Sequence, residues 1–312
     1  PCLILKDGGL FPSRRWPGIG RLVTEREKRT FIFIFYYRNY MDSTIRQVQL
    51  KCLEILDIVD KICRDHQIQY SLCGGTVVGA HLYKKCLPWD DDIDLMMTRE
   101  NYNRFIELAP KVLPEGFSVL NYQQGNYFEK GITKIVNDNT TYVENNGLTL
   151  GIFLDITVYD KVPTNCLRRI DMFMVNRSFT IMRGKIMQGG IKNKIRNLIL
   201  DTLLSDKKAF FTFFQKVAER LGRTKSYTYS ELFGAWAQTI SYRPTVFENY
   251  TKIEFEGRQY MIVRDYVEYL QVRYNRTDFR EPKEKQVAPH IEFVDFSLPY
   301  KEYLRQKSDK GE

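Results

Sequence analysis

Four of the five residues 90–94 are aspartates, and an apolar run follows them at once in the segment PWDDDIDLMM. A strand over 92–97 carries Asp92 and Asp94 on one face, because successive side chains of a strand point to opposite faces. Ile93 and Leu95 then point into a core. Two carboxylates held this close repel each other and raise a pKa unless a cation binds them. We therefore expect this strand to present a site for Mg²⁺ or Mn²⁺, which prefer oxygen ligands. The alternative, a solvated acidic loop, is disfavoured by the apolar flanks.

A third acid lies in a later apolar segment. A strand over 151–160 places Phe153, Asp155 and Thr157 on one face. A lone aspartate in such a strand is costly unless it is paired or binds a metal. If this strand lies beside 92–97, Asp155 completes a site of three carboxylates.

The segment Gly74-Gly75-Thr76 lies between a predicted strand over 68–73 and a short predicted helix over 77–85. Backbone N–H groups at such a helix start can hold a phosphate. Gly-Gly alone is more typical of a simple tight turn. Followed by Asp-x-Asp on the next strand, it has the layout of nucleotidyltransferase-type metal sites.

The remaining pattern predicts an α+β fold, a small mixed sheet flanked by helices and followed by a mostly helical C-terminal half. Apolar residues at spacings of three and four predict a helix over 43–66. We expect a catalytic core over 41–165 and a helical part over 166–312 that completes the site, interrupted by a hairpin over 251–263. Residues 1–40 show no helical or strand period, and we expect them to lie outside the fold, as a non-native or disordered extension.

Charge and cysteine content exclude several classes of protein. Residues 1–40 hold eight basic and three acidic residues, more than half of the net charge of +9. A basic nucleic-acid-binding face across the main domain is therefore not supported. The six cysteines form no C-x-x-C motif, which favours a reducing cytoplasm over a disulfide frame or zinc site. The apolar run over 31–37 is too short to span a bilayer, which needs about 20 residues.

With these residues in place, the segment 71–105 resembles the LicD/fukutin family of phosphotransferases, within the nucleotidyltransferase superfamily. It contains SLCGGTVVGA, then PWDDDID, then a helix RENYNRF, as the family pattern does. The likeness continues at 134–144, 151–163 and 269–290 and covers most of 41–290, weakly in the helical half. The PWDDDID block is highly specific.

The resemblance implies an activity. Such enzymes move a phospho-alcohol group, phosphocholine or a related alditol phosphate, from a CDP-activated donor to a sugar hydroxyl and release CMP, with a divalent metal. The acceptor implied is a cell-surface glycan (lipopolysaccharide, teichoic acid or capsule) or its lipid-linked precursor. The enzyme is expected in the cytoplasm or at the inner face of the membrane. Basic helices over 191–199 and 207–216 suit a peripheral membrane contact; an ordinary solvated helix face is the alternative.

The resemblance also implies residue roles. Asp92 and Asp94 match the metal-binding pair, with Asp90 as a helper. Asp155 matches the third acid, which binds metal or takes the proton of the acceptor.

Further matches concern the phosphates of the donor. Gly74, Gly75 and Thr76 match a phosphate cradle. Lys134 stands where a strand lysine could contact donor phosphate; an exposed strand lysine is the alternative. His290 matches a family position suited to acceptor or phosphate contact, with a structural role as the alternative. His66 and His81 are expected to be solvated and packed, respectively.

The chain departs from the family pattern after Gly79-Ala80. Many members carry Arg and His there, and this chain has Leu82, Tyr83 and Lys85. The metal core is intact, so the departures bear on the substrate more than on activity.

Two other function classes stay open. The first is a nucleotidyltransferase that transfers NMP from an NTP and releases pyrophosphate instead of CMP. The second is a non-catalytic binding module, which would need a broken metal site, whereas Asp92, Asp94 and Asp155 are all present.

Overall fold

A computed structural model describes residues 25–122, 132–145, 147–183, 207–232, 240–280 and 290–309, with the backbone alone for 25–43 and for parts of two later helices. The chain separates into two compact units, Pro1–Ser43 and Thr44–Glu312. None of the helices in the described part of the chain combines the length and apolar character that crossing a bilayer requires.

The first helix, α1 (Glu25–Asp65), is longer than expected. Its predicted apolar stripe is confirmed, because Val48, Ile55 and Val59 are fully buried. The helix predicted over 43–66 begins earlier than predicted, at Glu25. The chain has no glycine or proline between residues 25 and 65. Once a helix is nucleated, each further residue adds a hydrogen bond at little cost, so it extends without an apolar stripe of its own.

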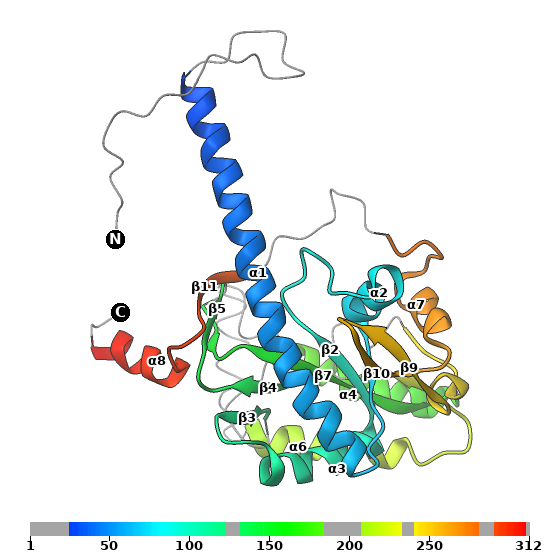
Figure 1. The fold of residues 1–312 in the computed structure, drawn as a ribbon. Coiled ribbons are helices and arrows are strands. Elements are labelled where there is room, and N and C mark those ends of the chain that lie inside the picture. The colour runs from blue at the N-terminus through cyan, green and yellow to red at the C-terminus, as the bar shows by residue number, and fades with distance from the viewer. Residues whose placement is uncertain are drawn as a thin grey trace. The chain divides into compact units, whose positions relative to one another are not determined.

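The central sheet is mixed, and the α+β class is confirmed (Figure 1). Its strand order is β1-β2-β7-β4-β3, and β8 pairs with the C-terminal part of β7. The pair β2–β7 is parallel and the other pairs are antiparallel. The strands are β1 (Ser71–Leu72), β2 (Asp94–Thr98), β3 (Phe117–Leu120), β4 (Thr133–Asn137), β7 (Phe153–Pro163) and β8 (Tyr227–Ser230).

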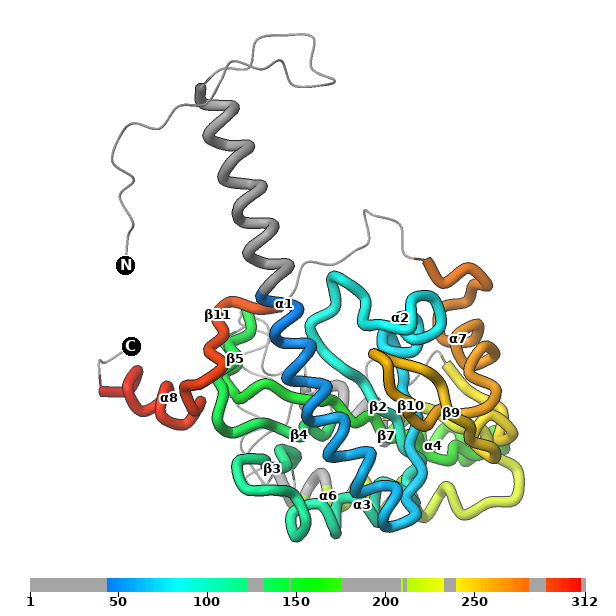
Figure 2. The backbone as a smooth tube through the Cα atoms, in the orientation of Figure 1, coloured from blue at the N-terminus to red at the C-terminus, as the bar shows by residue number. Residues whose placement is uncertain are grey.

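Helices α2 (Gly74–Tyr83) and α3 (Arg99–Val112) flank β2 in the chain. Figure 2 traces the backbone from β2 through α3, β3 and β4 and back to β7. The part of α1 from Thr44 onward packs on this sheet. Its Cys52 thiol lies 3.2 Å from the carbonyl oxygen of Phe153 in β7. Strand β1 is shorter than expected because the Gln69 N–H donates to the side chain of Asn101 instead of to a neighbouring strand.

Two smaller sheets complete the fold. Strands β5 (Thr141–Glu144), β6 (Thr149–Leu150) and β11 (Ile291–Asp295) form one, in the order β11-β5-β6. The hairpin expected over 251–263 is confirmed as β9 (Tyr250–Phe255) and β10 (Arg258–Val263). Its two turn residues, Glu256 and Gly257, have φ of 51° and 74°, as a tight hairpin turn requires.

The second half of the chain is not only helical. It contributes α4 (Cys166–Arg183), α6 (Lys207–Leu221), η1 (Pro244–Phe247), α7 (Tyr266–Tyr274) and α8 (Tyr300–Asp309). It also supplies β8 and β11, two strands too short for their periodicity to be recognised. Of the two basic helices considered for membrane contact, 191–199 lies outside the described residues and 207–216 belongs to α6.

Candidate metal centre

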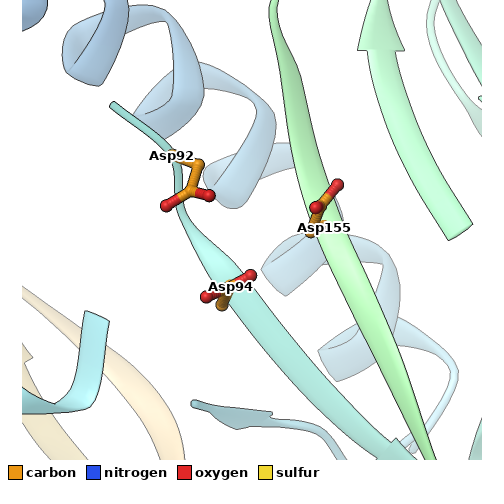
Figure 3. Close-up of side chains that lie close together, drawn as sticks. All are labelled: Asp92, Asp94 and Asp155. Atoms are coloured by element: carbon orange, nitrogen blue, oxygen red, sulfur yellow. The ribbon is translucent and has the colours of Figure 1, made fainter. Parts of the chain in front are cut away.

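The three acids expected to meet are brought together. Strands β2 and β7 are neighbours, and Asp94 lies directly opposite Asp155 in their parallel register, which confirms the expected pairing. One oxygen from each of Asp92, Asp94 and Asp155 lies within 4.8 Å of the others. Figure 3 shows Asp94 at the start of β2, Asp92 in the segment just before this strand, and Asp155 on the adjacent strand β7. The neighbouring Ile93 and Leu95 are fully buried, as the alternation predicted.

The cluster is electrostatically costly when no cation neutralises it. Burial, with repulsion from Asp155 and Asp91, raises the pKa of Asp92 to about 6. Burial and repulsion from Asp92 and Asp155 also raise the pKa of Asp94. The pKa of Asp90 is raised by burial and by Asp92 and Asp94. Carboxylates that hold protons this tightly are those that a divalent cation would stabilise.

A pH dependence follows from the shift at Asp92. Its folded-state pKa of about 6 exceeds the ordinary value of 3.8. Between these values the unfolded chain binds fewer protons at this residue, so the contribution of Asp92 to metal-free stability falls as pH rises and stops changing above about pH 6.5. We expect wild type to lose on the order of 1–3 kcal/mol relative to Asp92→Asn between about pH 4 and about pH 6.5. Urea unfolding in EDTA at several pH values measures the free energy of unfolding of both proteins. Plots of this free energy against pH that run parallel for the two proteins would contradict the prediction.

Lys134 is buried, not exposed. It is 4% exposed, and its Nζ lies 2.8 and 3.0 Å from the two carboxylate oxygens of Asp155. The same Nζ lies 3.4 Å from the centre of the Phe153 ring. The alternative considered for this residue, an exposed strand lysine, is therefore wrong. In this structure its charge compensates Asp155, so a contact with donor phosphate is not needed to explain it.

The two glycines let the start of α2 approach the carboxylates. Gly74 has φ of +56°, and a Cβ there would lie 2.8 Å from Oδ2 of Asp94. A Cβ on Gly75 would collide with the Asp90 carboxylate. Thr76 Oγ1 accepts the N–H of Asp94 at 2.9 Å. These residues do more than form a turn, because they bring the positive end of a helix against the acidic cluster.

The backbone of the acidic loop is anchored by residues that sequence reasoning missed. Gln49 on α1 donates from Nε2 to the carbonyl oxygens of Leu87 and Asp90, at 2.9 and 2.8 Å. Glu256 in the hairpin turn accepts the N–H of Cys86 at 2.9 Å and pairs with Arg46 through two contacts of 2.8 Å. The sequence did hold a signal for Gln49. This polar residue follows Ile45 by four positions and so lies on the apolar, buried face of the helix.

Replacing Gln49 by leucine is expected to loosen this loop. Gln49 is 4% exposed, and the substitution removes its hydrogen bonds to the carbonyl oxygens of Asp90 and Leu87. The Leu87 oxygen keeps the Asp90 N–H as a donor at 3.1 Å, so the larger loss is at the Asp90 carbonyl. A lost hydrogen bond costs about 0.5–1.5 kcal/mol and an unsatisfied buried group about 1–3 kcal/mol, so we expect a fall of about 2 kcal/mol in the free energy of unfolding. Urea denaturation measures it, with Glu54→Leu on the exposed face of α1 as control. Equal stability of the two variants would contradict the anchoring role.

Asp91 belongs to the framework, not to the cluster. Its Oδ2 accepts the Tyr142 hydroxyl at 2.7 Å and the His290 N–H at 3.0 Å. His290 thus reaches the acidic loop through its backbone, while its side chain is exposed. His81 lies edge-on against Tyr266 and Phe279, as expected for a packed side chain, but it is exposed. His66 is exposed, as expected.

Comparison with known proteins agrees with these observations. Residues 67–188 match the family described as LicD/FKTN/FKRP, nucleotidyltransferase domain. The chain is 30% identical over 264 residues to the lipopolysaccharide cholinephosphotransferase LicD of Haemophilus influenzae, across 80% of this chain and 97% of that protein. The glycines of α2 and all the clustered aspartates lie inside the family match.

Proposed function

Because the chain belongs to the LicD family, we propose that it transfers a phospho-alcohol group, phosphocholine or a related alditol phosphate, from a CDP-activated donor to a sugar hydroxyl and releases CMP. The observation that carries this proposal is the cluster of three carboxylates within 4.8 Å, in a chain 30% identical to a cholinephosphotransferase. The acceptor we propose is a cell-surface glycan or its lipid-linked precursor, since that relative is named for lipopolysaccharide.

The donor set fits Mg²⁺ or Mn²⁺. The support is that the set consists of carboxylate oxygens held by two neighbouring strands, and that burial and mutual repulsion raise the pKa of Asp92 and of Asp94, which a bound cation would offset. Asp92, Asp94 and Asp155 would hold the ion, with Asp90 beside them. A bound ion would supply charge neutralisation for the diphosphate and for the leaving CMP oxygen.

The protein's own groups would orient the reactants. The first-turn N–H groups of α2, at Gly75 and Thr76, have no partner within the helix and suit a phosphate oxygen. The acceptor oxygen would bond to the phosphorus that carries the alcohol, and the phosphoanhydride bond to CMP would break. The hydroxyl proton would pass to a carboxylate of the cluster. Asp155 is ion-paired with Lys134 at 2.8 Å.

The first experiment identifies donor and product. Purified protein with Mg²⁺ or Mn²⁺ is incubated with CDP-choline, CDP-ribitol, CDP-glycerol or CDP-ethanolamine, with and without a glycolipid extract as acceptor. We expect metal-dependent CMP from one donor, increased by the extract. Pyrophosphate from an NTP would replace this proposal by NMP transfer, the alternative reading. No product from any donor in the presence of extract would contradict it.

We propose the cytoplasm, including the inner face of the membrane, as the place of this reaction. The support is the state of the cysteines: Cys52, Cys63, Cys73, Cys86 and Cys166 are all free thiols in the described part of the chain. Fractionation of cells that produce the protein tests this. Recovery from an oxidising compartment would contradict it.

A further inference from the structure

A second cation lies close to the acidic cluster, on α7. A Cβ built on Gly74 would be 2.8 Å from Oδ2 of Asp94 and 3.9 Å from Nη2 of Arg273. The guanidinium and the metal-site carboxylate thus both lie near the first residue of α2. The hydroxyl of Tyr269, on the same helix as Arg273, accepts the Gly74 N–H at 3.2 Å. Helix α7 therefore contributes a face to the site.

Arg273 is not held in a close ion pair. Its Nη1 lies 3.6 Å from Oε2 of Glu231 and 3.5 Å from the Tyr159 hydroxyl, although its side chain is only 18% exposed. The largely buried Arg99 differs in this respect. Arg99 contacts the Asp160 carboxylate at 2.8 and 3.0 Å. A charge-assisted contact of this kind is expected at about 2.7–2.9 Å.

The surroundings of Arg273 are polar but mostly neutral. The hydroxyls of Tyr159, Tyr242 and Tyr274 interact with it. Phenols can accept its N–H groups, but they do not neutralise its charge. Keeping a guanidinium this buried without a close carboxylate is costly, so an anion that binds beside it would be strongly favoured.

We propose that Arg273 binds the diphosphate of the nucleotide donor, beside the start of α2. This inference rests on the proposed function, because it assigns a ligand to the same site. Lys134 is engaged by Asp155 and does not offer a free charge. The diphosphate brings negative charge towards a carboxylate cluster, and the planar fork of a guanidinium matches two phosphate oxygens. Arg273 is thus a substrate-binding residue that the sequence did not single out.

The test separates the phosphate from the rest of the nucleotide. Calorimetry with Mn²⁺ measures the binding of CDP and of cytidine to wild type, Arg273→Gln and Arg273→Lys. The matched control is Arg243→Gln, which removes an exposed arginine contact with Glu268, a residue of α7 like Arg273. We expect Arg273→Gln to weaken CDP binding by about 10- to 100-fold, the range for loss of a charged hydrogen bond. The affinity of Arg273→Gln for cytidine should equal that of wild type, and the control should bind CDP like wild type. The CDP affinity of Arg273→Lys should lie between those of wild type and Arg273→Gln.

The outcomes distinguish this inference from the function on which it rests. If Arg273→Gln is folded and binds CDP like wild type, the inference fails while the transferase proposal stands. If CDP and cytidine binding weaken equally, Arg273 is structural and the inference fails. If Arg273→Gln does not fold, Arg273→Lys decides, since a loss of CDP affinity with unchanged cytidine affinity supports the role. If wild type itself does not bind CDP, both proposals fall.

Discussion

Replacing Asp92 and Asp94 together by alanine is expected to abolish metal-dependent CMP release, with a loss of at least about 10³-fold in kcat/KM. The two residues supply two of the three carboxylates within 4.8 Å of one another. Loss of the ion would remove several kcal/mol of charge stabilisation from the transition state. The measurement is CMP release with the preferred donor, together with Mn²⁺ binding by calorimetry.

Stability distinguishes loss of a site from loss of a fold. The two alanines remove charges that repel each other, so the metal-free double variant should be no less stable than wild type. The matched control is Asp65→Ala with Asp171→Ala, two exposed aspartates on α1 and α4. The control should keep wild-type activity. Retention of more than a few per cent of CMP release by the Asp92/Asp94 variant would contradict the metal-site assignment.

Replacing Lys134 by methionine is expected to produce the largest loss of stability. Lys134 and Asp155 form a buried pair, 6% and 10% exposed, and methionine leaves the Asp155 carboxylate among other acids without its cation. Breaking a buried ion pair costs about 3–5 kcal/mol. Metal-free urea denaturation measures this loss. The exposed pair of Lys61 and Asp65 offers the control, since Lys61→Met should leave stability nearly unchanged.

A divalent cation should restore part of the stability of Lys134→Met. If Asp155 is a metal ligand, Mg²⁺ or Mn²⁺ supplies the positive charge that the lysine provided, so the deficit against wild type shrinks when the ion is added. Parallel thermal unfolding with EDTA and with Mn²⁺ measures this. A deficit that the ion leaves unchanged would show that Asp155 serves the ion pair and not the metal.

The backbone of the site was predictable from local pattern. Alternation in 92–97 and 151–160 showed which side chains share a face, and the structure confirms it through the buried Ile93 and Leu154 and the register of Asp94 with Asp155. The fold class also followed from these patterns. The start of the first helix was not predictable in the same way, since α1 begins at Glu25 and residues 25–40 showed no helical period.

The partners of the site residues were not predictable. Gln49, Glu256 and Arg273 reach the acidic loop or Gly74 from segments far away in the chain. Periodicity tells which way a side chain points, but not which distant residue it will meet. Asp91 shows the limit well. It is an aspartate like its neighbours, yet its carboxylate binds Tyr142 and the His290 backbone instead of facing the cluster.

The sequence by itself determined the family, the sheet-and-helix class and the identity of the clustered acids, because these depend on residue type and spacing along one segment. The tertiary structure alone decided how their charge is balanced. It pairs Lys134 with Asp155, sets Arg273 beside Gly74, and withdraws the acids from water far enough to raise the pKa of Asp92. Burial and charge compensation are sums over every neighbour in space, and those neighbours exist only once the strands and helices have packed.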